Sequence, residues 1–130
     1  MDIVRPILID TSVWIDVFRG KTPALAALVK TLLEDERAVL CDVVTAEIRV
    51  GLRASERRKV VSLLEAVTAI PVTPADWAEA GDLGSSLRSS GRTLPLTDLL
   101  IAVLCIRSGF ELLTLDDHFS GIEGLLLVRL

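Results

Sequence analysis

Histidine and cysteine are scarce in this sequence of 130 residues, which contains one histidine and two cysteines. These counts exclude a histidine triad and any metal site built from several histidines, and they supply no cysteine–histidine set for zinc. Cys41 and Cys105 both stand in apolar segments, so we expect buried free thiols without chemistry of their own. The net charge of −4 argues against a protein that coats nucleic acid by bulk electrostatics, but it leaves room for a local site.

Long apolar runs are missing as well. The longest, such as Leu99 to Ile106, are far below the ~20 residues that span a bilayer, and Ile7 to Ile9 is too short for the hydrophobic region of a signal peptide. We therefore expect a soluble, cytoplasmic protein without membrane contacts. Hydrophobic residues make up 51% of the chain and charged residues 25%, which is typical of a folded protein. The length predicts one domain over residues 1–130, large enough to fold without a structural metal.

Short apolar runs alternate with segments whose apolar residues follow helical spacing. The predicted strands cover about 5–9, 38–40, 69–72, 111–114 and 125–130. The predicted helices cover about 13–19, 23–33, 43–52, 55–67, 77–89 and 97–108. This alternation predicts an α/β fold with a central, mainly parallel sheet of four to five strands and helices on both faces.

Two acidic residues follow predicted strands. In open α/β sheets, sites form outside the carboxyl ends of the strands, which gives Asp10 and Asp116 a claim to function. Taken alone, each is better explained as a helix cap or a turn former, because aspartate is favoured at such junctions.

Two further acids stand in apolar helices. Glu47 lies close to the buried stripe of its helix, where the alternative is an edge residue that pairs with Arg49 or Arg53. Asp98 begins the most apolar helix of the chain, where the alternative is an acid favoured by the helix dipole.

The four acids could meet at one edge of a parallel sheet. If they lay about 5 Å apart, their repulsion would total on the order of 20 kcal/mol, which exceeds the stability of a typical domain. Such a cluster needs a cation or partial protonation. Ligands that are all oxygen favour Mg²⁺ or Mn²⁺.

Four motifs carry these acids in one order along the chain. They are Asp10-Thr11-Ser12, Val44-Thr45-Ala46-Glu47-Ile48, Leu96-Thr97-Asp98-Leu99-Leu100-Ile101-Ala102 and Thr114-Leu115-Asp116-Asp117-His118-Phe119. Together they cover nearly the whole chain and resemble the PIN-domain ribonucleases, with the closest likeness to the VapC-type toxins of prokaryotic toxin–antitoxin pairs. The resemblance implies a PIN-like fold and an endoribonuclease that cleaves RNA phosphodiesters with water activated by Mg²⁺ or Mn²⁺. It leaves open whether one or two ions bind.

The resemblance also implies roles for the acids. Asp10, Asp98 and Asp116 would be metal ligands, and Glu47 would be a ligand or would orient the attacking water. These four residues form the expected catalytic set.

Neighbouring residues receive lesser roles. Ser12 and Thr114 match hydroxyl positions near the family's site. The family's pattern of a threonine, one further residue and then an acid selects Asp116 as the fourth acid, while Asp117 is an alternative that would otherwise assist the site or be exposed. His118 is expected to pack in its turn and is left out of the catalytic set.

The resemblance further implies three partners, which are RNA, a co-expressed antitoxin and a second copy of the chain in a homodimer. Arg49, Arg53 and Arg57 recur every four positions and are candidates for RNA contacts, the alternative being a solvated surface. Trp14 and Phe18 are candidates for one wall of a groove for the antitoxin, with a core position favoured for Trp14.

Two other functions are compatible with parts of the sequence. A phosphoacceptor receiver has similar length and alternation, but it needs an aspartate after a middle strand, where this chain has Thr73 and Pro74. A catalytically silent PIN fold that serves as a binding module is the other alternative. All four acids are present, so an assay has to separate that module from an enzyme.

Overall fold

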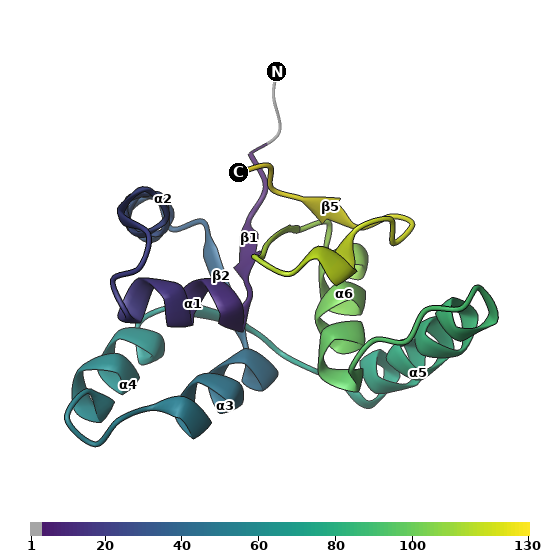
Figure 1. Cartoon of the computed structure of the whole chain (residues 1–130), viewed down its shortest axis with the longest axis horizontal. Helices are drawn as coiled ribbons and strands as arrows, with labels where there is room; N and C mark the ends of the chain where they lie inside the picture. The colour runs from purple at the N-terminus through teal and green to yellow at the C-terminus, as the bar shows by residue number, and fades with distance from the viewer. Residues whose placement is uncertain (1–3) are drawn as a thin grey trace.

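The computed structural model (Figure 1) describes residues 4–130. It contains a five-stranded parallel sheet with the order β3-β2-β1-β4-β5. The strands are β1 (Ile7–Ile9), β2 (Ala38–Cys41), β3 (Thr68–Ile70), β4 (Glu111–Leu113) and β5 (Leu126–Leu127). The predicted parallel sheet is therefore confirmed.

Six α-helices connect the strands: α1 (Thr11–Phe18), α2 (Pro23–Glu34), α3 (Asp42–Gly51), α4 (Arg57–Glu65), α5 (Pro74–Ser89) and α6 (Leu96–Ser108). The chain moves outward from β1 to β3 and then returns across the sheet to β4. Because parallel crossovers are right-handed, this reversal places α1–α4 and α5–α6 on opposite faces. Figure 1 shows α1–α4 grouped on one side of β1 and α5–α6 on the other, as the alternation predicts.

The helix α6 lies at the centre of the packing. Residues 99–105 are all buried, because α6 packs against both β4 and α5. Gly84 on α5 permits this approach, since a Cβ atom there would lie 2.8 Å from Cδ1 of Leu99. Cys41 and Cys105 are buried and free, as predicted, and burial raises the pKa of both thiols. None of the described helices has the length and apolar character needed to cross a bilayer.

The predicted ends of several elements were displaced. The strand expected over 69–72 covers Thr68–Ile70, because Pro71 has no N–H for a further ladder bond. The helix expected from Ser55 begins at Arg57. The last strand is reduced to Leu126–Leu127, and a 3₁₀ turn, η1 (Asp117–Phe119), was not predicted.

The helix α5 begins three residues before the predicted start because of a capping box. The hydroxyl of Thr73 accepts a hydrogen bond from the N–H of Asp76, whose Oδ2 accepts one from the N–H of Thr73 at 2.8 Å. Arg107 on α6 then donates to both oxygens of Asp76, at 2.6 and 2.9 Å, and to the carbonyl of Pro71 at 2.9 Å. This buried carboxylate therefore joins α5, α6 and the end of β3.

Replacing Asp76 tests this junction. The Arg107 guanidinium holds the pKa of Asp76 at about 2, against an ordinary value of 3.8. A depressed pKa contributes stability that is complete above about pH 4 and is lost as the pH falls toward 2. We expect Asp76→Ala to lower the free energy of unfolding at pH 7 by about 1.5–3 kcal/mol, the usual net value of a hydrogen bond to a charged group, because it removes the acceptor for the Thr73 N–H and for Arg107.

The measurement is urea denaturation at several pH values, with Glu79→Ala on the exposed face of α5 as control. The difference between the wild type and Asp76→Ala should shrink between pH 4 and pH 2. A difference that stays constant over this range would contradict the assigned ion pair.

Candidate active site

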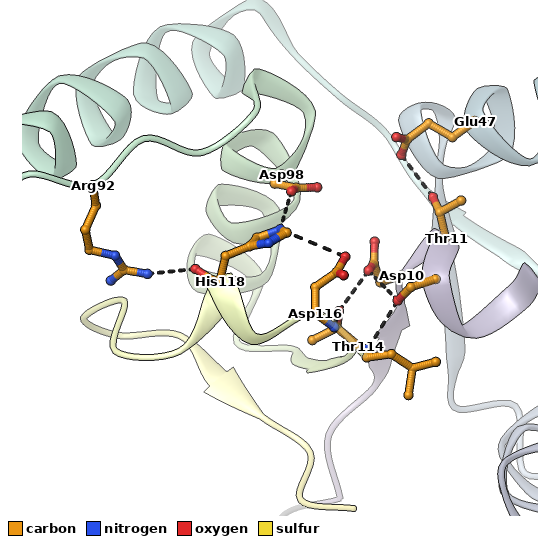
Figure 2. A network of polar contacts seen from close by, with 10 residues as sticks. Asp10, Thr11, Glu47, Arg92, Asp98, Thr114, Asp116 and His118 are labelled. Carbon is orange, nitrogen blue, oxygen red and sulfur yellow. Dashed lines mark hydrogen bonds and ion pairs between the residues drawn. The ribbon is translucent and has the colours of Figure 1, made fainter. Parts of the chain in front are cut away.

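The site lies at the switch point of the sheet, where the chain leaves β1 for β2 on one side and enters β4 on the other. Asp10 follows β1 directly, and Asp116 follows β4 after two residues. Asp98 is in the first turn of α6, and Glu47 is in the middle of α3. Figure 2 shows the side chains of Asp98, Asp116 and Asp10 gathered around this point, with Glu47 set apart from them on α3.

Asp10 is nearly inaccessible, with 3% of its surface exposed. Its main chain begins α1, since its carbonyl accepts from the N–H groups of Val13 and Trp14 at 3.1 and 3.3 Å. Its side chain does not cap that helix. Instead, Oδ2 accepts hydrogen bonds from Ser12 Oγ and Thr114 Oγ1, both at 2.8 Å. The capping explanation for Asp10 therefore applies to its backbone and leaves its carboxylate unexplained.

The two hydroxyls also hold the segment after β4. Ser12 Oγ accepts from the N–H of Leu115 at 3.1 Å, and Thr114 Oγ1 accepts from the N–H of Asp116 at 3.0 Å. Among the residues that the structure describes, no donor reaches Oδ1 of Asp10. The carboxylate is thus fixed through one oxygen, and its other oxygen has no described donor.

Glu47 is held in the same manner by a residue that the sequence did not single out. Thr11 Oγ1 donates to Oε1 of Glu47 at 2.9 Å, which joins the start of α1 to α3. The alternative pairing with Arg49 or Arg53 is not formed among the described contacts. The position of Thr11 beside Asp10 in the first motif was the available signal, but hydroxyls at helix starts are common for local reasons.

Asp98 contacts the one histidine of the chain. Nε2 of His118 lies 2.5 Å from Oδ2 of Asp98 and 3.9 Å from Oδ2 of Asp116 (Figure 2). The side chain of Asp98 does not cap α6. His118 does pack against Phe119, as the turn interpretation expects, but that interpretation missed its contact with the acids.

The acids influence one another electrostatically. The pKa of Glu47 is raised above its ordinary value, chiefly by burial and further by the charges of Asp10, Asp98 and Asp116, while the Thr11 hydrogen bond lowers it. The pKa of Asp98 is raised as well, again chiefly by burial and also by Asp10 and Asp116. Each raised pKa means that the charged form is disfavoured where the acids gather.

A divalent cation fits this donor set by chemistry and by charge. The carboxylate oxygens are hard ligands of the kind that Mg²⁺ and Mn²⁺ prefer, and a cation would relieve their repulsion. Within residues 4–130, no three His, Cys, Asp or Glu side chains stand in an arrangement that already encloses an ion. Binding by three of the acids would therefore require some side-chain rotation, and Asp116 is the acid whose carboxylate accepts no described hydrogen bond.

The remaining candidates lie outside this contact network. Asp117 is exposed in η1. Arg49 and Arg57 line one shallow hollow of about 470 Å³ with Arg58, while Arg53 lies in the loop between α3 and α4. The spacing of four therefore does not make one helix face, because α3 ends at Gly51.

Comparison with known proteins places the chain in a family. The family model described as "PIN domain" matches residues 7–125. The chain is 32% identical to "VapC ribonuclease Mb1587" of Mycobacterium bovis over 121 residues, covering 89% of this chain and 90% of the relative. It is 35% identical to "Ribonuclease VapC10" of Mycobacterium tuberculosis over 120 residues, covering 92% and 90%.

Solved structures agree in fold. The VapBC2 structure from Rickettsia felis, bound to a promoter DNA fragment, matches with a TM-score of 0.81 at 20% identity, covering 95% of this chain and 98% of that one. VapBC-5 from Mycobacterium tuberculosis, described as a member of a family of toxin–antitoxin systems, matches with a TM-score of 0.67 at 24% identity, covering 98% and 100%. The match of the PIN domain model over most of the chain, together with the relatives above 30% identity, shows that the chain belongs to the PIN domain family.

Proposed function

We propose that this chain is a divalent-metal-dependent endoribonuclease that acts in the cytoplasm as the toxin of a toxin–antitoxin pair. The observation that carries the proposal is the gathering of four acids from separate segments at the switch point, with none of the three aspartate side chains used as a helix cap. Relatives named as VapC ribonucleases support it. Membership of the PIN family sets aside the receiver alternative.

In the proposed mechanism, Asp10, Asp98 and Asp116 hold Mg²⁺ or Mn²⁺. When bound, the cation would lower the pKa of water and neutralise charge on the phosphate. Oε1 of Glu47 is occupied by Thr11, so Oε2 is the oxygen available to orient the attacking water or to accept its proton. The raised pKa of Glu47 suits a proton acceptor.

RNA binding needs positive charge on an acidic protein. Arg49 and Glu47 are two residues apart on α3, so their side chains leave the helix roughly 200° apart. We propose that Arg49 and Arg57, with Arg53 between their helices, contact RNA phosphates beyond the acids rather than among them. The shared hollow of Arg49 and Arg57 supports this assignment.

The proposed protein partners are a cognate antitoxin and a second copy of the toxin. Relatives solved as VapBC proteins support the antitoxin. Trp14 is fully buried, with Nε1 donating to the carbonyl of Ile9 at 3.1 Å, so the core position favoured for it is confirmed. Phe18 stacks on Trp14 at 5.8 Å and is half-buried, so it is the one of the pair that is open to a partner.

The first functional test is Asp98→Asn. The amide keeps the shape but weakens ligation of a hard cation, so we expect Mg²⁺- or Mn²⁺-dependent RNA cleavage to fall at least 100-fold without loss of fold. Gel assays on RNA with circular dichroism provide the measurement, and Asp82→Asn on exposed α5 is the matched control. Full activity in excess chelator would exclude the metal mechanism, and inactivity of the wild type would favour the silent module.

Thermal unfolding tests the gathering of the acids. A ligand that binds the folded state at 100 times its Kd adds about 2.7 kcal/mol, so we expect Mn²⁺ to raise Tm by several degrees. The shift should shrink in Asp10→Asn and persist in Asp82→Asn. Absence of saturable Mn²⁺ binding in the wild type would show that the carboxylates do not share a cation.

The arginine assignment predicts a binding defect. Arg49→Gln combined with Arg57→Gln should raise KM for RNA several-fold, leave kcat near the wild-type value and reduce the salt dependence of binding by about one ion for each lost phosphate contact. Arg129→Gln, next to the edge strand β5, is the control. Equal KM values for the double variant and the control would place the RNA elsewhere.

A further inference from the structure

Three of the four acids share one pattern of hydrogen bonding. Oδ2 of Asp10 accepts hydrogen bonds from the hydroxyls of Ser12 and Thr114. Oε1 of Glu47 accepts one from the hydroxyl of Thr11. Each acid keeps its second oxygen free of described donors. Fixing one oxygen restricts the rotation of the carboxylate and so determines where the other oxygen lies.

Asp98 follows this pattern, with His118 in the place of the hydroxyls. Nε2 of His118 lies 2.5 Å from Oδ2 of Asp98, which leaves Oδ1 without a described donor. The second acid near the ring, Asp116, is too far at 3.9 Å for a direct hydrogen bond. The imidazole therefore contacts one oxygen of one acid.

The main chain of His118 is held from outside the acidic cluster, and its ring packs beside Phe119. The guanidinium of Arg92, in the loop between α5 and α6, donates to the carbonyl of His118 at 2.7 Å. The next residue, Phe119, is fully buried, and its ring lies 5.1 Å from the imidazole. Figure 2 shows Arg92, His118 and Asp98 in succession. Because Arg92 and the buried Phe119 hold the main chain of His118, the position of this residue does not depend on its contact with Asp98 alone.

We propose that His118 is a positioning residue, which donates from Nε2 to Oδ2 of Asp98 and so presents Oδ1 to the cation. The proposal rests on the proposed metal-dependent function. In metalloproteins generally, removing the hydrogen-bond partner of a metal ligand lowers metal affinity or activity by about 10–100-fold.

The first experiment needs no metal. Because the chain has one histidine, a long-range ¹H–¹⁵N NMR spectrum of the metal-free protein reports on this imidazole alone. We expect a proton on Nε2. A proton on Nδ1 alone would overturn the proposal, since Nε2 would then have nothing to donate.

The second experiment measures Mn²⁺ affinity by calorimetry and RNA cleavage for three variants. His118→Ala should bind Mn²⁺ about 10-fold more weakly and lose kcat by a similar factor, with KM for RNA unchanged. His118→Gln, whose amide can donate to the same oxygen, should recover most of both. Ser120→Ala, exposed in the following segment, is the matched control with wild-type values.

The outcomes separate this role from the proposed function. Unchanged or tighter Mn²⁺ binding in His118→Ala would overturn the role alone, because the imidazole would then be idle or in competition with the ion. If His118→Gln had Mn²⁺ affinity and kcat as low as those of His118→Ala, the role would also be overturned, because a hydrogen-bond donor at this position would not suffice. Absence of Mn²⁺ binding in the wild type would overturn the proposed function and this role with it.

Discussion

The burial of one carboxylate, that of Asp10, is the constraint on which the rest of the site depends. A charged group in a protein interior is tolerated when hydrogen bonds replace its water, and Ser12 and Thr114 supply them. Both hydroxyls also accept hydrogen bonds from main-chain N–H groups, those of Leu115 and Asp116. The atoms that stabilise the first acid therefore fix the segment that carries the fourth.

This coupling extends across the molecule through short side chains and one imidazole. Thr11 fixes Glu47 on α3, and His118 contacts Asp98 on α6, so acids from both faces of the sheet are tied to the ends of β1 and β4. Each contact restrains a carboxylate without occupying both of its oxygens. A site prepared in this way leaves to a cation a smaller adjustment, the rotation of the Asp116 side chain, whose carboxylate accepts no described hydrogen bond, because the segments that carry the acids are already in place.

The fold was predictable because its signals are local. Apolar alternation gave the strand and helix order, and the unbroken apolar run of α6 indicated its central position. The predicted boundaries were wrong where a residue is compatible with two kinds of local structure. The strand β3 ends before Pro71, earlier than predicted. The helix α5 begins at the capping box of Thr73 and Asp76, before the first residue of its apolar pattern. Thr73 is extended, as a strand residue is, so the side-chain hydrogen bonds of the capping box, rather than the local apolar pattern, determine where α5 begins.

For the site, the sequence by itself determined which acids are present and, through their positions after strands and at helix starts, that they could meet. It did not determine which oxygen of each acid is held, or by what. Thr11 and Glu47 are far apart in sequence, as are His118 and Asp98, and these contacts exist because a parallel sheet brings the ends of β1 and β4 together while helices from opposite faces approach the same edge. A hydrogen bond depends on fractions of an ångström, and the packing of the whole chain sets that distance.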